Sequence, residues 1–299
     1  MTTTSVRNAS IAAPPPASGG QRRSRKKGND QAGWVTYAFL VLVALLSMLP
    51  FWYMIVSASR SMAEMNQSPP PLLPGGDLWS NIRTALEVQP LVRAIINSAI
   101  VSSVVALGTV FFCTLAGFAF AKLRFRGRNA LFAITIGTLM IPPTLGVVPL
   151  YQIMSALDLT GKLTSVILPT LVTAFGVFFM RQYLVQTVPD EILEAARVDG
   201  ASTSRTFLSI IVPIARPGMA VLGMLSFMAA WNDFFWPLIA LTSRNPTVQV
   251  ALNNLGQGYV PDQAIIMAGT LFGTLPVIVV FALLGRQIVG GIMAGAVKG

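Results

Sequence analysis

The sequence contains no histidine, a single cysteine and few charged residues, and each scarcity excludes a class of protein. Without histidine among its 299 residues, the chain cannot build zinc sites with imidazole ligands or histidine-based catalytic triads. The lone Cys113 lies in an apolar run, so it implies neither a disulfide framework nor a cysteine cluster. Charged residues make up 11% of the chain, against about 25% in typical soluble domains, which is too few to cover a soluble fold. The chain is therefore neither a soluble enzyme nor an intrinsically disordered protein.

Long uncharged stretches occupy most of the chain, in which 54% of the residues are hydrophobic. Six stretches are near or above the roughly 18–20 residues that a helix needs to cross a hydrocarbon core about 30 Å thick. One of them is interrupted only by Asp233. We therefore predict an all-α, polytopic membrane protein with six transmembrane helices, at about residues 34–58, 94–121, 129–157, 163–181, 217–241 and 263–285.

The basic residues indicate how these spans are oriented. Six spans place both termini on one side of the membrane, and the termini and loops of that side hold most of the 21 lysines and arginines. The opposite side holds only Arg60, Arg83, Arg93, Lys162 and Arg244. The positive-inside rule therefore places both termini in the cytoplasm. The net charge of +10 then reflects topology, and we expect no binding to nucleic acid.

The first 33 residues differ in composition from the rest of the chain. They are polar, with a proline run at Pro14–Pro16 and a basic cluster at Arg22–Lys27. We predict that residues 1–33 form a disordered, basic cytoplasmic tail and that residues 34–299 form the transmembrane domain. The basic cluster either only orients the first span or also contacts the anionic headgroups of membrane lipid.

Proline and glycine interrupt two of the predicted spans. Pro142–Pro143 and Gly146 lie in the third span, and Gly269, Gly273 and Pro276 lie in the sixth. Broken backbone at membrane depth is tolerated only where protein or a water-filled cavity covers it. Each interruption therefore predicts either a pathway or hinge, or a kink that improves packing.

The loop between the fourth and fifth spans, residues 182–216, is long and rich in helix-forming residues. Pro189 suits the first position of a helix, and Asp190 and Glu191 follow at the positive end of the helix dipole. Gly200 suits the position just past the end of this helix. The loop therefore predicts a helix outside the membrane.

A second, short helix is predicted after this glycine. Ser202 or Thr203 can cap it, and Pro213 is expected to end it. The small pair Ala195–Ala196 in the first helix would let the backbone of another protein approach closely, and Glu194 could accept a hydrogen bond or ion pair. This helix–glycine–helix element is therefore a candidate contact with another protein.

The same loop follows the pattern E-A-A-x3-G-x9-I-x-L-P from Glu194 to Pro213, with Val212 in place of the leucine. This pattern resembles the EAA loop of ABC importer permeases, and Pro217 also matches its extended form. By this resemblance, the residues expected to couple the chain to an ATPase are Glu194, Ala195, Ala196, Asp199, Gly200, Ala201, Phe207 and Pro213.

Other stretches resemble the carbohydrate-uptake group of these permeases, of the maltose-transporter type. They are Ala230–Leu238 (AWNDFFWPL), the C-terminal Gly291–Gly299, and Pro50-Phe51 followed by Ser57, Arg60 and Glu64. The likeness covers about residues 34–299 and leaves the N-terminal tail unexplained.

The resemblance implies a type I ABC importer permease fold and sugar uptake through the plasma or inner membrane of a prokaryote. The implied partners are a second homologous permease subunit, two ATPase subunits, and an extracellular sugar-binding protein that delivers a di- or oligosaccharide. The C-terminal tail is expected to reach the ATPase dimer interface. Because the chain has no G-x4-G-K-[ST] loop, we expect it to be no enzyme and to bind no metal or cofactor, with ATP and Mg²⁺ on the ATPase.

Asp233 is the one ionisable residue deep within an apolar stretch. Placing it there costs about 2.5–3.5 kcal/mol, so it is expected to face the bundle interior or a cavity. With Trp231 and Asn232 beside it, an aromatic platform and polar groups suit a sugar, and we predict that these three residues line the substrate pathway. The alternatives are structural pairing with the partner permease, which can itself carry most substrate contacts, and a position near the outer interface.

Residues 242–262 are predicted to lie outside the cell and resemble the loop that contacts the substrate-binding protein. The residues expected in this contact are Asn253, Asn254, Gly256 and Gly258. An ordinary exposed turn is the alternative.

Three alternative functions differ from this hypothesis in what they require of the sequence. A secondary transporter would have inverted repeats and a midplane ion site, but the two halves show no convincing repeat, and the EAA loop would have no purpose. An intramembrane enzyme lacks a catalytic set, since the chain has no histidine and one deep carboxylate. A permease of the same kind for a non-sugar solute stays open, because the sequence does not specify the solute.

Overall fold

The computed structural model describes residues 33–257 and 262–296, and within these ranges the chain forms helices, turns and irregular segments without a β-strand. The chain divides into two units, Met1–Leu49 and Pro50–Gly299. The described part of the first unit is the beginning of helix α1 (Trp34–Ala58), whose residues there are exposed. The predicted disordered tail, residues 1–33, lies outside the described residues except for Gly33.

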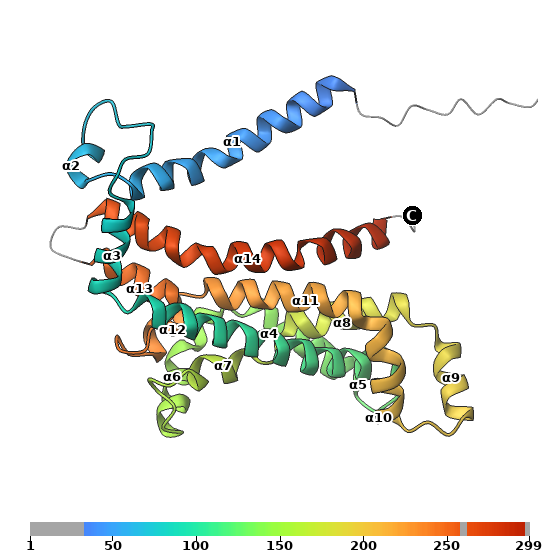
Figure 1. The fold of residues 1–299 in the computed structure, drawn as a ribbon. Coiled ribbons are helices and arrows are strands. Elements are labelled where there is room, and N and C mark those ends of the chain that lie inside the picture. Colours follow the sequence, from blue (N-terminus) through green and yellow to red (C-terminus); the bar gives the residue numbers. More distant parts are fainter. Residues whose placement is uncertain (1–32, 258–261, 297–299) are drawn as a thin grey trace, which may run out of the picture. The chain divides into compact units, whose positions relative to one another are not determined.

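The second unit contains the end of α1 and the later helices (Figure 1). Its α-helices are α2 (Met62–Met65), α3 (Leu78–Val88), α4 (Leu91–Lys122), α5 (Arg128–Gly137), α6 (Val147–Ala156), α7 (Thr164–Ile167), α8 (Ala174–Thr187), α9 (Asp190–Val198), α10 (Thr203–Thr206), α11 (Val212–Asn232), α12 (Phe235–Ala240), α13 (Val248–Leu255) and α14 (Gln263–Ala296). The 3₁₀ turns are η1 (Thr138–Met140), η2 (Pro143–Gly146) and η3 (Leu168–Thr170), and η4 (Phe207–Ile211) is π-helical.

The described residues contain six spans if each sharply bent pair of helices is counted as one. Four helical runs are long and apolar enough to cross a membrane on their own: Trp34–Ala58, Leu91–Lys122, Thr203–Asn232 and Gln263–Val280. The two bent pairs are Arg128–Met140 with Pro143–Ala156, and Thr164–Thr170 with Ala174–Thr187. The structure is thus the all-α, polytopic arrangement with six spans that the sequence predicts.

The third span bends by 95° at the predicted prolines. Ile141 and Pro142 both have extended backbone, with ψ of 118° and 126°, because a residue that precedes a proline is disfavoured in the helical region. A new 3₁₀ turn then starts at Pro143. The predicted break in this span is confirmed.

The predicted interruption of the sixth span is wrong, because α14 continues without a break through Pro276. Its glycines allow close packing instead. A Cβ atom on Gly269 would lie 2.6 Å from Cδ1 of Leu255, and one on Gly273 would lie 3.0 Å from Cγ2 of Val248. Both neighbours belong to α13, so these glycines let α13 and α14 approach one another.

The fourth span has a bend that the sequence analysis did not predict. Residues 171–173 separate η3 from α8, and the axes of the two parts differ by 42°. The Thr173 hydroxyl caps α8 by accepting the N–H of Gly176 at 3.0 Å. Helix α8 then continues to Thr187, beyond the predicted end of the span at residue 181.

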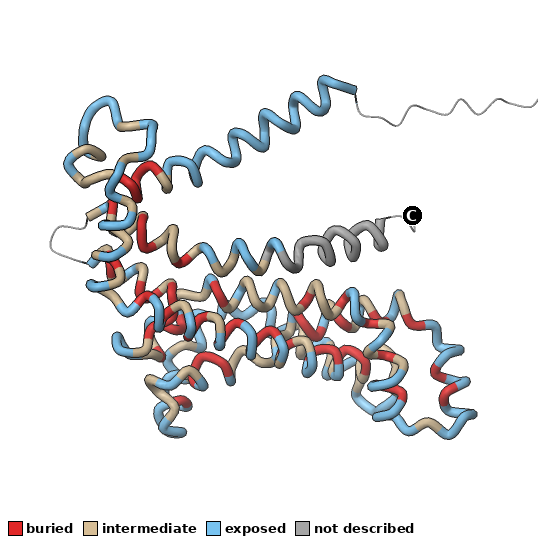
Figure 2. Tube along the Cα trace, viewed as in Figure 1, coloured by how far each residue is buried: buried red, intermediate tan, exposed pale blue. Residues whose placement is uncertain are grey.

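The main core of the second unit lies between α4, α8 and α11, which pack against one another. At its centre are fully buried side chains of all three helices: Cys113, Met180 and Leu222. Figure 2 shows buried residues recurring along these helices, with exposed residues between them. Helix α4 also contacts α13 and α14, so it is the common neighbour of most of the bundle.

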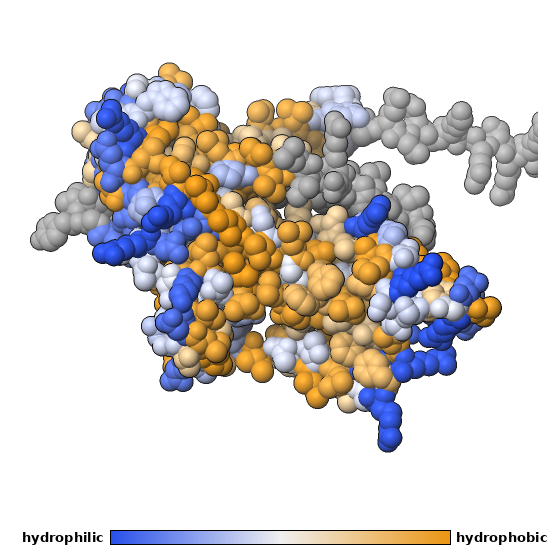
Figure 3. Space-filling model, turned by 60° about the horizontal axis from the view of Figure 1, so that its bottom comes forward, coloured by the Kyte–Doolittle hydropathy of each residue, from blue (hydrophilic) through white to orange (hydrophobic). Residues whose placement is uncertain are grey.

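Outside this core, many large hydrophobic side chains are exposed, such as Leu107 on α4 at 72%. In the view of Figure 3, hydrophobic residues cover the middle of the second unit, and hydrophilic residues gather toward α9 and toward α3. Exposed apolar faces of this extent are expected where lipid or another protein covers the helices.

The close contact between α4 and α8 leads to a prediction about Gly117. A Cβ atom on Gly117 would lie 2.8 Å from both the backbone nitrogen of Arg181 and Cβ of Met180. We expect Gly117→Val to push the two helices apart and to destabilise the protein by about 1–3 kcal/mol. The measurement is the thermal unfolding midpoint of the purified protein in detergent.

Gly137→Val is the matched control, because no atom lies within 4 Å of the added Cβ. Its midpoint should stay at the wild-type value. A thermal unfolding midpoint of Gly117→Val equal to that of the wild type would contradict the close packing of α4 on α8.

Candidate functional site

The predicted docking element is a separate helix, α9, that connects α8 to α10. Pro189 is its N-cap, with extended backbone, rather than its first residue as predicted, and the helix begins at Asp190. Asp190 and Glu191 lie in the first turn and Arg197 in the last. This order of charges complements the helix dipole, which is positive at the N-terminus.

The end of α9 explains the spacing of the EAA pattern. Gly200 has φ of +74°, in the left-handed region that favours glycine. Its N–H donates to the carbonyl of Arg197 at 3.0 Å, and the N–H of Ala201 donates to the carbonyl of Ala196 at 2.9 Å. Together with Asp199 at the C-cap, these bonds form a Schellman motif. The predicted stop at Gly200 is confirmed, and E-A-A-x3-G-A is a helix followed by its termination signal.

The two faces of α9 have different surroundings. Leu193 and Ala196 are buried against the same chain, whereas Glu194 and Ala195 are exposed and Val198 is 87% exposed. Successive residues of a helix point about 100° apart, so the two alanines cannot share a face. Ala195 is therefore open to another protein, and Ala196, which we also expected to be open, is covered by its own chain.

An ion pair joins α9 to the end of α4. The Lys122 ammonium donates to Oδ1 of Asp190 at 2.7 Å. This hydrogen bond and the positive charge of Lys122, with Arg124 and Arg197 nearby, hold the pKa of the Asp190 carboxyl below its ordinary value of 3.8. Sequence reasoning treated Lys122 only as a topological charge and missed this contact.

A polar cavity of about 270 Å³ lies between α9 and the turn that follows α4. Charged residues of both segments line it: Lys122, Arg124, Arg128, Asp190, Glu194 and Arg197. The predicted coupling residue Glu194 therefore lies at the rim of a basic cavity of its own chain.

The second helix of the predicted element starts as expected and ends differently. The Ser202 hydroxyl accepts the N–H of Arg205 at 3.3 Å and caps α10. The expected end at Pro213 is wrong, because α10, η4 and α11 form one helical run. The N–H of Val212 donates to the carbonyl of Phe207, five residues earlier, which is the π-helical pattern. This wider turn lets the helix continue past Pro213, which has no N–H, and Phe207 itself is buried.

The predicted pathway residues lie at a helix break. Helix α11 ends at Asn232 and α12 begins at Phe235, so Asp233 lies between them, half-buried and near the backbone N–H groups of Phe235 and Trp236. Asn232 is exposed, but Trp231 is buried and stacks on Phe227 of its own helix, with ring centroids 5.8 Å apart. Two of the three predicted residues are therefore accessible, and the indole of Trp231 is not.

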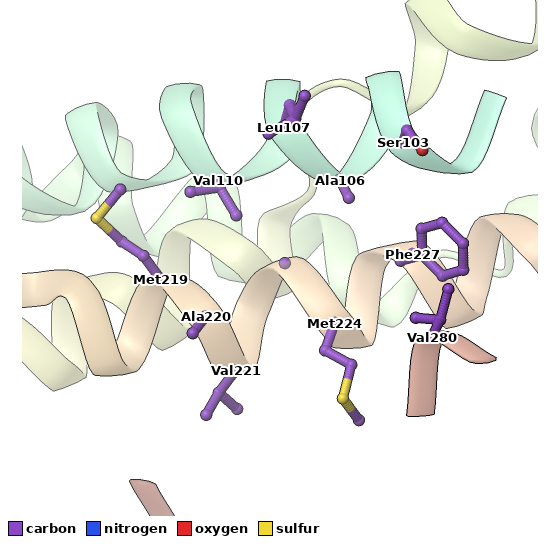
Figure 4. Close-up of a pocket in the computed structure, with 11 residues that line it drawn as sticks. Ser103, Ala106, Leu107, Val110, Met219, Ala220, Val221, Met224, Phe227 and Val280 are labelled. Atoms are coloured by element: carbon purple, nitrogen blue, oxygen red, sulfur yellow. The ribbon is translucent and has the colours of Figure 1, made fainter. Parts of the chain in front are cut away.

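A second cavity, of about 530 Å³, is lined by α4 and α11 together with Val280 of α14 (Figure 4). Ser103 is the only polar side chain that lines it. Such a surface cannot supply the hydrogen bonds that a hydroxylated solute loses on leaving water. This apolar cavity is therefore a poor candidate for a sugar site.

The segment expected to contact a binding protein contains a helix, α13, and Gly256 lies in the turn that follows it. Asn253 is exposed, and its Oδ1 accepts a hydrogen bond from Gln257 at 2.8 Å. Asn254 is half-buried and Gly256 is the C-cap. Gly258 lies outside the described residues.

Two polar residues in the first turns of α4 hold this segment, and the sequence analysis missed them. The Asn97 amide donates to Oδ1 of Asn245 at 2.9 Å and to the carbonyl of Pro246 at 2.8 Å, and the Ser98 hydroxyl accepts the N–H of Val248 at 2.8 Å. Adjacent Asn and Ser in an apolar stretch were the signal that could have identified them.

No metal site is visible in the part of the chain that the structure describes. Residues 33–257 and 262–296 contain no group of three or more Cys, Asp and Glu side chains that could hold a metal ion.

Residues 113–292 match the family model described as "Binding-protein-dependent transport system inner membrane component". The arabinooligosaccharides transport system permease protein AraQ of Halalkalibacterium halodurans is 35% identical over 204 residues, 68% of this chain and 73% of that protein. The lactose transport system permease protein LacG of Rhizobium radiobacter is 31% identical over 265 residues, 88% of this chain and 96% of that protein.

A solved structure is also similar. It is described as a bacterial ABC transporter involved in the import of the acidic polysaccharide alginate. The TM-score is 0.71 at 22% identity, over 84% of this chain and 94% of the other. The two chains share their fold.

The lowered pKa of Asp190 gives a prediction about pH. The ion pair with Lys122 is present above the ordinary carboxyl pKa of 3.8 and is lost only as the pH falls through the lowered value. We expect the hydrogen-exchange protection of α9, corrected for intrinsic rates, to be nearly equal at pH 5 and pH 3.8, the pH at which an ordinary aspartate is half protonated. Exchange followed by mass spectrometry measures it.

Asp190→Asn is the control, because its side chain does not titrate. Protection that falls between pH 5 and pH 3.8 in the wild type and stays constant in Asp190→Asn would contradict the lowered pKa.

Proposed function

Because the chain belongs to the family of binding-protein-dependent transport system inner membrane components, we propose that it is the permease subunit of an ATP-driven importer for a di- or oligosaccharide. The observation that carries this proposal is α9, an exposed helix with the EAA pattern that is joined directly to two candidate spans. The relatives described as arabinooligosaccharide and lactose permeases support a sugar as the solute.

In this proposal the energy comes from separate subunits. The sequence has no G-x4-G-K-[ST] loop, so two partner ATPase subunits bind ATP and Mg²⁺ and hydrolyse the nucleotide. They dock on the exposed side of α9, where Glu194, Ala195 and Val198 are accessible. A second permease subunit completes the pathway, and an extracellular binding protein delivers the sugar.

The two ends of α4 support positions on opposite sides of the membrane for α9 and for the segment before α13. Its 32 residues extend over about 48 Å at 1.5 Å per residue, so Leu91 and Lys122 lie on opposite sides of a membrane. Lys122 contacts α9, and Asn97, near the other end, holds the segment before α13. With α9 assigned to the cytoplasm by the positive-inside rule, the proposal puts residues 242–262 on the extracellular side, where they can meet the binding protein.

The solute pathway in this proposal passes the break between α11 and α12. Asn232 offers an exposed amide, and Asp233 offers a half-buried carboxylate beside backbone N–H groups. These groups can exchange hydrogen bonds with sugar hydroxyls, whereas the buried Trp231 holds the end of α11 in place.

The test of the proposed function is reconstitution into lipid vesicles with the ATPase, the second permease and the loaded binding protein. We expect ATP-dependent accumulation of labelled sugar, which Gly200→Pro abolishes. Proline fixes φ near −65° and removes the N–H that bonds to Arg197, so the Schellman stop of α9 cannot form.

Gly127→Pro is the matched control. Gly127 has a similar φ of +82° but lies before α5, outside the docking element, so uptake should persist. Uptake without ATP that depends on an ion gradient would instead identify a secondary transporter. Accumulation of a different solute at the expense of ATP would identify a permease for a non-sugar solute.

A second prediction concerns Asp233. We expect Asp233→Ala to lower the rate of sugar uptake by about tenfold or more, since removing a hydrogen-bonding partner of a desolvated group costs about 1–3 kcal/mol. The amount of assembled complex, measured by co-purification of the ATPase, should change little. If assembly fell and the uptake per assembled complex were unchanged, Asp233 would be a structural residue.

A further inference from the structure

The ion pair between Lys122 and Asp190 connects two segments that are 68 residues apart in the sequence. Lys122 is the last residue of α4 and Asp190 the first residue of α9. The Lys122 side chain is only 7% exposed, whereas the Asp190 side chain is 77% exposed. The lysine is therefore built into the bundle, and the carboxylate comes to it from the docking helix.

Apolar packing around Lys122 fixes this arrangement. Leu193, on the same face of α9 as Asp190, belongs to the core cluster that contains Phe118 and Phe207, whose rings lie 5.7 Å apart. Phe118, Lys122 and Leu193 together line a small cavity of about 50 Å³. The position of α9 on α4 is thus set by one charged and one apolar contact.

No other ion pair within 4.0 Å connects α9 to another part of the described chain. Arg124 and Arg128 line the neighbouring cavity, and Glu194 and Arg197 face it from α9. None of these four forms an ion pair among residues 33–257 and 262–296. Lys122 is the cation that holds Asp190.

The covalent chain joins α9 to α8 on one side and to α10 and α11 on the other. The ion pair adds a connection to a third helix, α4, which packs against both α8 and α11. Through Asn97 and Ser98, α4 also holds the segment at the beginning of α13. A displacement of α9 can therefore reach the opposite end of the bundle along one continuous helix.

We propose that Lys122 is a positioning residue that fixes α9 on α4, so that ATPase-driven movement of α9 is transmitted to α4 as well as to α8 and α11. This inference rests on the proposed function. Without the ion pair, α9 can shift or tilt against α4 when the ATPase moves it, and ATP is hydrolysed with less transport. Lys122 thus controls the efficiency of coupling rather than the docking itself.

The test uses the complete reconstituted transporter and measures both sugar uptake and ATP hydrolysis. Lys122→Met removes the charge, keeps most of the apolar stem, and leaves Asp190 free to bind water. We expect the ratio of sugar transported to ATP hydrolysed to fall about fivefold or more, the lower range of allosteric coupling effects, with the complex still assembled. Lys122→Arg keeps the positive charge, so this variant should keep most of the wild-type ratio of sugar transported to ATP hydrolysed.

Arg83→Met is the matched control, because it breaks the Arg83–Glu87 pair, which is exposed and lies on α3. Its ratio should equal that of the wild type. Asp190→Ala should lower the ratio as Lys122→Met does, and the double variant should lower it no further, since both changes remove the same contact.

Three outcomes would overturn the inference: a wild-type ratio in Lys122→Met, additive losses in the double variant, or less assembled complex with an unchanged ratio. A wild-type complex that shows no ATP-dependent uptake would instead overturn the proposed function. The wild-type measurement therefore distinguishes the two failures.

Discussion

In hydrocarbon every backbone N–H and C=O group needs a partner within the protein, and this constraint decides where a span can break. The fourth span breaks before α8, and side chains supply the partners. The Thr109 hydroxyl of α4 donates to the carbonyl of Thr170 at 3.2 Å, and the Thr173 hydroxyl accepts the N–H of Gly176, in the first turn of α8, at 3.0 Å. The Trp236 indole of α12 donates to the carbonyl of Ser165 at 3.0 Å. The bend therefore depends on α4 and α12 being in place.

The same helix, α4, connects the two candidate contact regions of the chain. Near its beginning Asn97 holds the segment before α13, and at its end Lys122 holds α9. Between them Cys113 is buried in the core with α8 and α11. In the proposed function, this one helix links movement at α9 to movement at the segment before α13, because it contacts both.

The features that the sequence predicts correctly depend on local signals. Uninterrupted apolar length gives the spans, Pro142–Pro143 gives the sharp bend, and the left-handed Gly200 gives the end of α9. The errors involve tertiary contacts. Pro213 stays within a helix because a π-helical turn accommodates it, and Lys122 finds a partner 68 residues away. The hydrophobic periodicity of a segment predicts neither the π-helical turn before Pro213 nor the ion pair between Lys122 and Asp190.

The composition of the candidate pathway indicates what the second permease subunit must provide. A sugar that leaves water loses hydrogen bonds at every hydroxyl, and each group left unpaired costs about 1–3 kcal/mol. At the break after α11, this chain offers the Asn232 amide, the Asp233 carboxylate and a few backbone N–H groups, while its larger cavity is almost entirely apolar. So few partners cannot surround a di- or oligosaccharide. The proposed function therefore requires the second permease subunit to provide the other polar wall of the pathway, and the exposed apolar faces of this chain are surfaces that such a subunit or lipid would cover.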